Sequence, residues 1–132
     1  MSQVEYQALA EFRFLIERYL KHADDGARSV GLEPQQYQGL LAVRSSYEVG
    51  RPTIRILADR LQITHHSAVG LADRMEKNGL IRRQRSKSDC RKVFLRATPR
   101  AERLLSRLAH YRIAELRETA PSLVHALKIA MS

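Results

Sequence analysis

The stretch from Thr53 to Gly79 constrains the fold most strongly, because it holds two short helical patterns with almost no chain between them. Thr53 and Thr64 are each placed to cap a helix, since a threonine hydroxyl accepts a hydrogen bond from an amide of the first helical turn. Residues 61–63 predict a tight turn between the helices, and Asn78-Gly79 predicts the end of the second. Apolar residues at helical spacing predict the inner face of that second helix: Ala68, Leu71, Ala72 and Met75.

A basic hairpin is predicted directly after these helices. Residues 80–85 and 91–96 each predict a strand, with residues 86–89 as the turn and with Val93 and Leu95 alternating inward. The order of helix, tight turn, helix and hairpin is typical of a helix-turn-helix followed by a wing. We therefore expect a mainly α fold with a small β-hairpin.

Longer helical patterns flank this unit. From Val4 to about Ala23 apolar residues recur every three or four positions, and Asp24-Asp25-Gly26 is expected to end that helix. A second helix is expected from Pro34 to about residue 47. Thr98-Pro99 begins the last long helix, which Pro121 is expected to stop. Ser122 would then cap a separate final segment that reaches Ala130.

Length and composition indicate one soluble domain. The chain has 132 residues, of which 44% are hydrophobic and 28% charged. No apolar stretch is long enough to cross a membrane, and the N-terminus lacks the pattern of a signal peptide, so we expect a cytoplasmic protein without a membrane partner. Cys90 is the single cysteine, which excludes an intramolecular disulfide and fits a reducing compartment.

The positive charge of the chain is concentrated in its middle. Residues 51–100 hold thirteen Lys and Arg against four Asp and Glu, and the net charge of the whole chain is +9. Between Arg82 and Arg96 seven basic residues face one acidic residue, Asp89. Such crowding repels itself in an isolated hairpin and is relieved by a polyanion. Double-stranded DNA is therefore the expected partner.

The outward face of the second short helix is expected to read base edges in the major groove. Arginines and a lysine of the hairpin are expected to meet phosphates, and Ser67 or amides at the helix start can do the same. The candidate DNA-binding residues are Thr64, His65, His66, Ser67, Val69, Gly70, Arg74, Arg83, Arg85, Lys87, Asp89 and Arg91.

Three runs in this order carry a resemblance to a known family. They are Leu57-Ala58-Asp59-Arg60-Leu61, residues 66–83 with their Gly79-Leu80-Ile81 helix end, and residues 89–99 with Asp89-x-Arg91, Val93-x-Leu95 and Thr98-Pro99. Together they resemble MarR-family regulators over about residues 32–110. The ordered set is specific, although each piece alone is weak.

The resemblance implies a ligand-responsive regulator, expected to be a repressor, that binds a palindromic operator as a homodimer. It places Arg91 in the minor groove, with Asp89 holding it through a salt bridge. It also implies a single domain over residues 1–132, with a winged helix-turn-helix over about 33–98 and dimerisation helices over about 1–30 and 99–132. Two departures are the short tail of eleven residues after Pro121 and Ala101, which stands where the family commonly has glycine.

Two triggers for release from DNA are open. The family commonly binds small aromatic or phenolic acids between the dimer helices and the winged domain, and the candidate pocket residues are Phe14, Arg18, Tyr37, Leu41 and Tyr111. The ordinary alternative is that these five belong to the core or the interface. Cys90 is the rival trigger, since nearby cations lower the pKa of a thiol and oxidation there would disturb the wing. The chain has no second cysteine to resolve an oxidised thiol, so the ordinary alternative is that Cys90 has no role in sensing.

Other classes of function fit less well. The five histidines are scattered, and no nucleophile, paired-carboxylate or phosphate-loop arrangement is present, so we expect no enzyme. His65 and His66 diverge by about 100° around a helix, so we expect neither a metal nor a cofactor. A non-specific nucleic-acid-binding protein remains an alternative.

Overall fold

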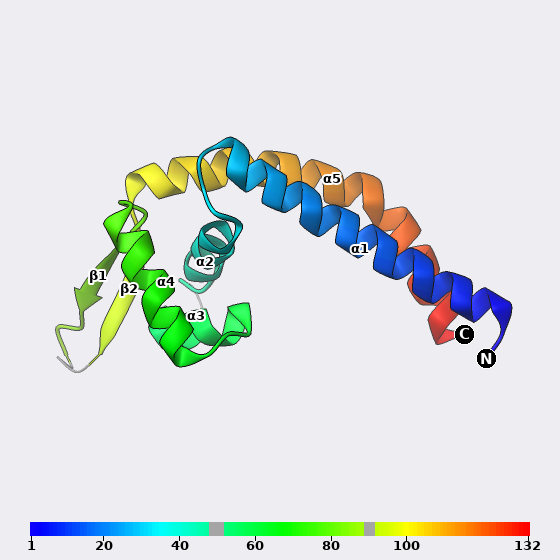
Figure 1. Ribbon diagram of the computed structural model, residues 1–132, viewed down its shortest axis with the longest axis horizontal. Helices are drawn as coiled ribbons and strands as arrows, with labels where there is room; N and C mark the ends of the chain where they lie inside the picture. The colour runs from blue at the N-terminus through cyan, green and yellow to red at the C-terminus, as the bar shows by residue number, and fades with distance from the viewer. Residues whose placement is uncertain (48–51, 89–91) are drawn as a thin grey trace.

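The computed structural model describes residues 1–47, 52–88 and 92–132, and it is mainly helical with one antiparallel hairpin, as expected. A compact unit of short elements lies at one end, and two long helices extend side by side away from it (Figure 1). The elements in chain order are α1 (Gln3–Ser29), α2 (Pro34–Ser45), α3 (Ile54–Leu61), α4 (His65–Lys77), β1 (Ile81–Arg85), β2 (Val93–Ala97) and α5 (Pro99–Met131). None of the helices in the described ranges has both the length and the apolar character of a membrane span.

The expected end of the first helix at Asp24-Asp25-Gly26 is wrong, because α1 continues to Ser29. Packing outweighs the low helix propensity of these residues: Ala27 is fully buried, and a Cβ at Gly26 would lie only 3.7 Å from the Leu108 side chain of α5. The chain turns away from the helix at Gly31, whose φ of +82° lets the amide of Leu32 reach the carbonyl of Ala27 at 2.9 Å.

The expected stop at Pro121 is also wrong, and Ser122 caps no separate segment. A single helix, α5, runs through Pro121 to Met131. Proline removes one helical hydrogen bond and disfavours a helix interior. Thr119 and Ala126 on either side are nevertheless buried, and α1 lies along α5 over this stretch (Figure 1). Contact with α1 therefore holds the helix together across the proline.

The hairpin is confirmed with shifted bounds. The strands pair from Ile81 opposite Ala97 to Arg85 opposite Val93. Leu80 lies outside β1 because its amide bonds to the carbonyl of Met75 at 2.9 Å and so helps to close α4. Asp89, Cys90 and Arg91, which include the expected start of the second strand, lie outside the described residues.

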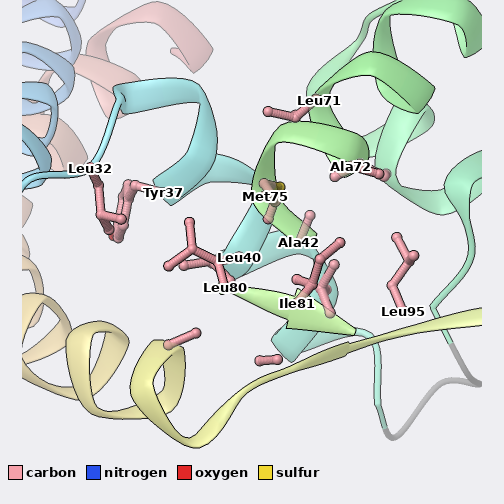
Figure 2. Packing of buried hydrophobic residues seen from close by; sticks show 14 of the residues in the cluster. Leu32, Tyr37, Leu40, Ala42, Leu71, Ala72, Met75, Leu80, Ile81 and Leu95 are labelled. Atoms are coloured by element: carbon pink, nitrogen blue, oxygen red, sulfur yellow. The ribbon is translucent and has the colours of Figure 1, made fainter. Parts of the chain in front are cut away.

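The core of the compact unit lies among α2, α3, α4, the hairpin and the start of α5 (Figure 2). Its central contact joins α2 to α4. A Cβ added at Gly39 would lie 2.9 Å from the sulfur of Met75, so any other residue there would force the fully buried Met75 side chain to shift. The largest fully buried side chains are Leu40, Val43, Leu57, Leu71, Met75, Leu80, Ile81 and Leu95.

Tyr47 holds the hairpin from the side of α2. Its hydroxyl accepts a hydrogen bond from the amide of Ala97 at 2.7 Å. The guanidinium carbons of Arg44 and Arg96 lie 4.9 and 5.7 Å from the centre of its ring. The amide of Leu95 also donates to the carbonyl of Pro52 at 2.8 Å. The second strand is thus fixed along the edge that β1 leaves open.

Replacing Gly39 by alanine should destabilise the fold, although alanine is the better helix former. Overpacking of the Gly39–Met75 contact should cost about 1–3 kcal/mol, which exceeds the gain of about 1 kcal/mol in helix propensity. The matched control is Gly70→Ala in α4, where the added Cβ meets only the flexible end of Arg74 at 3.5 Å. Chemical denaturation should give Gly39→Ala a lower free energy of unfolding than Gly70→Ala, and the reverse order would contradict the packing argument.

Candidate nucleic-acid interface

The turn between α3 and α4 fixes the angle at which α4 is presented. Gln62 adopts a left-handed conformation with φ of 56°, and the amide of Ile63 donates to the carbonyl of Ala58 at 3.0 Å. The hydroxyl of Thr64 then accepts a hydrogen bond from the amide of Ser67 at 3.1 Å and caps α4, as predicted. The chain therefore leaves one helix and enters the next within a few residues, the connection of a helix-turn-helix.

The two faces of α4 separate as the sequence predicts. Ala68, Leu71, Ala72 and Met75 are fully buried. His65, His66 and Ser67 are exposed at the start of the helix. Val69 and Gly70 are half-buried on the next turn. This short outward face can approach base edges, because nothing else in the described ranges covers its histidines.

Two of the expected contacts at α4 already have partners within the protein. The amide and hydroxyl of Ser67 are both bonded to the Thr64 hydroxyl, at 3.1 and 3.0 Å. The guanidinium of Arg74 lies 3.5 Å from the side-chain carbonyl of Gln35 on α2. Arg74 is exposed, so this weak contact leaves it able to reach a phosphate.

The basic residues of the hairpin divide into two groups. Arg85 and Lys87 are exposed toward the hairpin tip. Arg83 faces α4 instead and forms ion pairs with Glu76 at 2.6 Å and with Asp73 at 2.7 Å. Burial would lower the pKa of Arg83, but hydrogen bonds and charges from these two carboxylates outweigh it and raise the pKa. This difference could not be predicted from the sequence, because Arg83 and Arg85 stand on the same strand face.

The five candidates for an effector pocket are not brought together. Arg18 lies over the ring of Phe14, with 5.5 Å between the guanidinium carbon and the ring centre. Tyr111 borders a hollow of about 340 Å³ that lies against the C-terminal end of α1. Tyr37 is buried in the core, and Leu41 is half exposed on α2. Tyr111 therefore lines a hollow between the end of α1 and α5, and Phe14 and Arg18 line a separate one along α1.

A charged cluster beside that hollow was missed by sequence reasoning. Arg112 is only 14% exposed, and its Nε and Nη1 atoms have no hydrogen-bond partner among the described residues. Glu115 lies 3.6 Å from Nη1, beyond hydrogen-bond distance, and its other oxygen is 2.6 Å from Nδ1 of His22 on α1. The positions of Arg112 and Glu115 one turn apart on α5 were a signal, but only the pairing with α1 shows that they turn inward.

Burial and neighbouring charges also shift the pKa values of two tyrosines near this cluster. The pKa of Tyr19 is raised mainly by burial, against an opposing effect of Arg112. The pKa of Tyr37 is likewise raised by burial first and by Tyr19 second. Both phenols therefore stay protonated at neutral pH and able to donate a hydrogen bond.

The described residues contain no group of three or more His, Cys, Asp or Glu side chains placed to hold a metal ion. His65 and His66 stand at the start of α4 without an acidic or thiol neighbour that would complete such a site in those ranges.

The arrangement of α2, α3, α4 and the hairpin is a winged helix, the fold of many DNA-binding regulators. A protein-family model described as MarR family matches residues 36–93 of the sequence. An uncharacterised HTH-type transcriptional regulator of Bacillus subtilis, YsmB, is 30% identical over 111 residues, which cover 78% of this chain and 74% of YsmB. The chain belongs to the MarR family of DNA-binding transcriptional regulators.

Solved structures agree on the fold. CouR of Rhodococcus jostii RHA1, bound to p-coumaroyl-CoA, superposes with a TM-score of 0.71 at 22% identity, over 87% of this chain and 80% of CouR. A variant of MepR of S. aureus, bound to an oligodeoxyribonucleotide, gives 0.68 at 21% identity, over 89% of this chain and 82% of MepR. Members of this family are regulators and not enzymes.

Proposed function

We propose that this protein is an effector-responsive repressor that binds a palindromic operator as a homodimer in the cytoplasm, and that it has no enzymatic activity. The observation that carries the proposal is the exposed start of α4 beside a basic hairpin. These elements lie at one end of an arm, formed by α1 and α5, that has exposed apolar side chains. The MepR variant bound to an oligodeoxyribonucleotide has the same fold and supports DNA as the partner. Footprinting on the DNA upstream of the protein's own gene tests the proposal directly.

Helix α4 and the basic hairpin should differ in what they recognise in DNA. In our proposal His66 and Val69 face the major groove, in which all four base pairs can be distinguished. Arg85, Lys87 and Arg74 meet phosphates in our proposal, and Arg91, braced by Asp89, enters the minor groove as the family resemblance implies. Arginine suits that groove because a narrow minor groove has a strongly negative potential.

Selection from randomised half-sites at two salt concentrations should separate these roles. His66→Ala should change the preferred half-site. Lys87→Ala should weaken binding to all sequences alike and flatten the salt dependence by about one unit of slope. If His66→Ala keeps the wild-type preference while Lys87→Ala changes it, α4 is not the reading helix. A protein that shows no preference at all would instead be a non-specific nucleic-acid binder.

Exposed apolar side chains support the homodimer. In the described part of the chain, every exposed large apolar residue except Met1 and Leu41 lies on α1 or α5. Leu9 is 55% exposed and Leu127 is 43% exposed, although both helices are long and already paired with each other. Such a face is typical of a protein–protein interface, and a second copy would place two winged helices on a palindrome.

Leu127→Glu should convert the dimer to a monomer, because a carboxylate would be buried without a partner in the interface. The matched control is Leu41→Glu, which alters a similarly exposed leucine on α2, away from the arm. Light scattering at micromolar concentration should report a dimer for the wild type and the control. A wild-type monomer would contradict the assembly.

The cluster around Arg112 supports a small acid as the effector. Arg112 lines the hollow of about 340 Å³, which has the size of a small aromatic molecule's site, and its ion pair with Glu115 at 3.6 Å is too long for a hydrogen bond. A turn of this side chain toward the hollow would let its guanidinium donate to the carboxylate of a ligand. The p-coumaroyl group of the CouR ligand supports the aromatic part of this ligand, and since that group is a thioester, the carboxylate rests on Arg112 alone. Oxidation of Cys90, which lies outside the described residues, is the alternative trigger.

Hydroxybenzoates and hydroxycinnamates should raise the melting temperature of the wild-type protein and weaken its binding to DNA. Arg112→Gln should abolish both effects, whereas Arg103→Gln, an exposed arginine earlier on α5, should leave them unchanged. Release by peroxide in the wild type but not in Cys90→Ser, with no response to the acids, would favour the thiol trigger.

A further inference from the structure

Arg83 is held by α4 through three contacts. Its Nη1 atom donates to Glu76 at 2.6 Å and its Nη2 atom donates to Asp73 at 2.7 Å. Its backbone amide donates to the second oxygen of Glu76 at 3.2 Å. The planar guanidinium therefore spans two carboxylates while the strand backbone is fixed to one of them.

The two carboxylates belong to the helix that carries the reading residues. Asp73 and Glu76 are one turn apart and so share one side of α4, while His66 and Val69 lie one to two turns earlier. On the strand, Arg83 is paired with Leu95, which is fully buried. Both ends of the contact are thus anchored in the core, and a change in it would alter the angle between α4 and the hairpin.

The charges of this cluster argue against a phosphate contact by Arg83. One guanidinium faces two carboxylates, so the cluster as a whole repels a phosphate. The Arg83 side chain is 28% exposed, whereas Asp73 is 62% exposed, so the carboxylates and not the arginine face solvent. A phosphate would have to displace hydrogen bonds of 2.6 and 2.7 Å.

We infer that Arg83 is a positioning residue: it sets the angle between the reading helix and the wing, and through that angle the operator sequence that the protein prefers. This inference rests on the proposed DNA binding. It replaces the phosphate contact expected for Arg83 from the sequence, and it leaves that role to Lys87 and its exposed neighbours.

The test compares Arg83→Gln, Arg83→Lys and Glu76→Gln in the full-length protein, with Arg82→Gln as the matched control. Arg82 is the preceding arginine of β1, exposed and without an ion pair in the described ranges. Half-site selection and binding at two salt concentrations are measured for each. A positioning role predicts that Arg83→Gln and Arg83→Lys both change the preferred half-site, because lysine cannot span the two carboxylates, and that Arg82→Gln does not.

Glu76→Gln separates the two roles most clearly. If Arg83 positions the wing, this variant shifts the preferred half-site in the same way as Arg83→Gln. If Arg83 contacts a phosphate, Glu76→Gln frees it, so binding tightens for all sequences and the salt dependence steepens. That result, or a wild-type preference retained by Arg83→Lys, overturns the inference.

A measurement without DNA distinguishes failure of this inference from failure of the proposed function. The melting temperatures of the wild type, Arg83→Gln, Glu76→Gln and the double variant form a double-mutant cycle. The melting temperature of the double variant should fall by less than the sum of the decreases in the two single variants. If the two decreases in melting temperature add up, Arg83 and Glu76 do not interact, and the inference is overturned. A coupled pair in a wild-type protein that selects no half-site overturns both the proposed reading of DNA and the positioning role.

Discussion

The contact between α2 and α4 is the constraint on which the rest of this structure depends. Met75 lies where a Cβ at Gly39 would crowd it, and it is fully buried together with Ala68, Leu71 and Ala72 on the same face of α4. With one face of α4 fixed, its opposite face must be exposed, and the tight turn at Gln62 sets where that face begins. The surface that meets DNA in our proposal is therefore determined from inside the domain.

Most of this arrangement could be predicted from the sequence because it depends on local signals. The threonine caps of three helices, the apolar spacing of α4 and the glycine at its end act within a few residues of one another. The strand bounds shifted because Leu80 closes α4 before it can pair with a strand. Local chemistry thus predicted the order of the elements, and only their edges depended on packing.

Most of the errors arise where two elements distant in sequence pack together, above all along the contact between α1 and α5. Gly26 and Pro121 are helix breakers by propensity, yet each lies where the neighbouring helix holds the chain in place. Arg112 and Glu115 have the spacing of an exposed pair, and only the neighbouring helix turns them into a buried cluster. The ion pairs of Arg83 likewise join two elements, so no window of sequence around either one could indicate them.

Tyr47 connects the arm to the wing by a route that avoids α4. Glu102 near the start of α5 bonds to Arg44 at 3.0 Å, Arg44 stacks on Tyr47, and Tyr47 holds the amide of Ala97 in β2. The hairpin is thus contacted on one strand by α4 through Arg83 and on the other by Tyr47, which Arg44 of α2 joins to α5. A rotation of α5 about its own axis would pull on one strand of the wing and leave the other attached to α4. Because Arg44 belongs to α2, the same rotation would also act on the helix that packs against α4, and the hairpin and the reading helix would respond together.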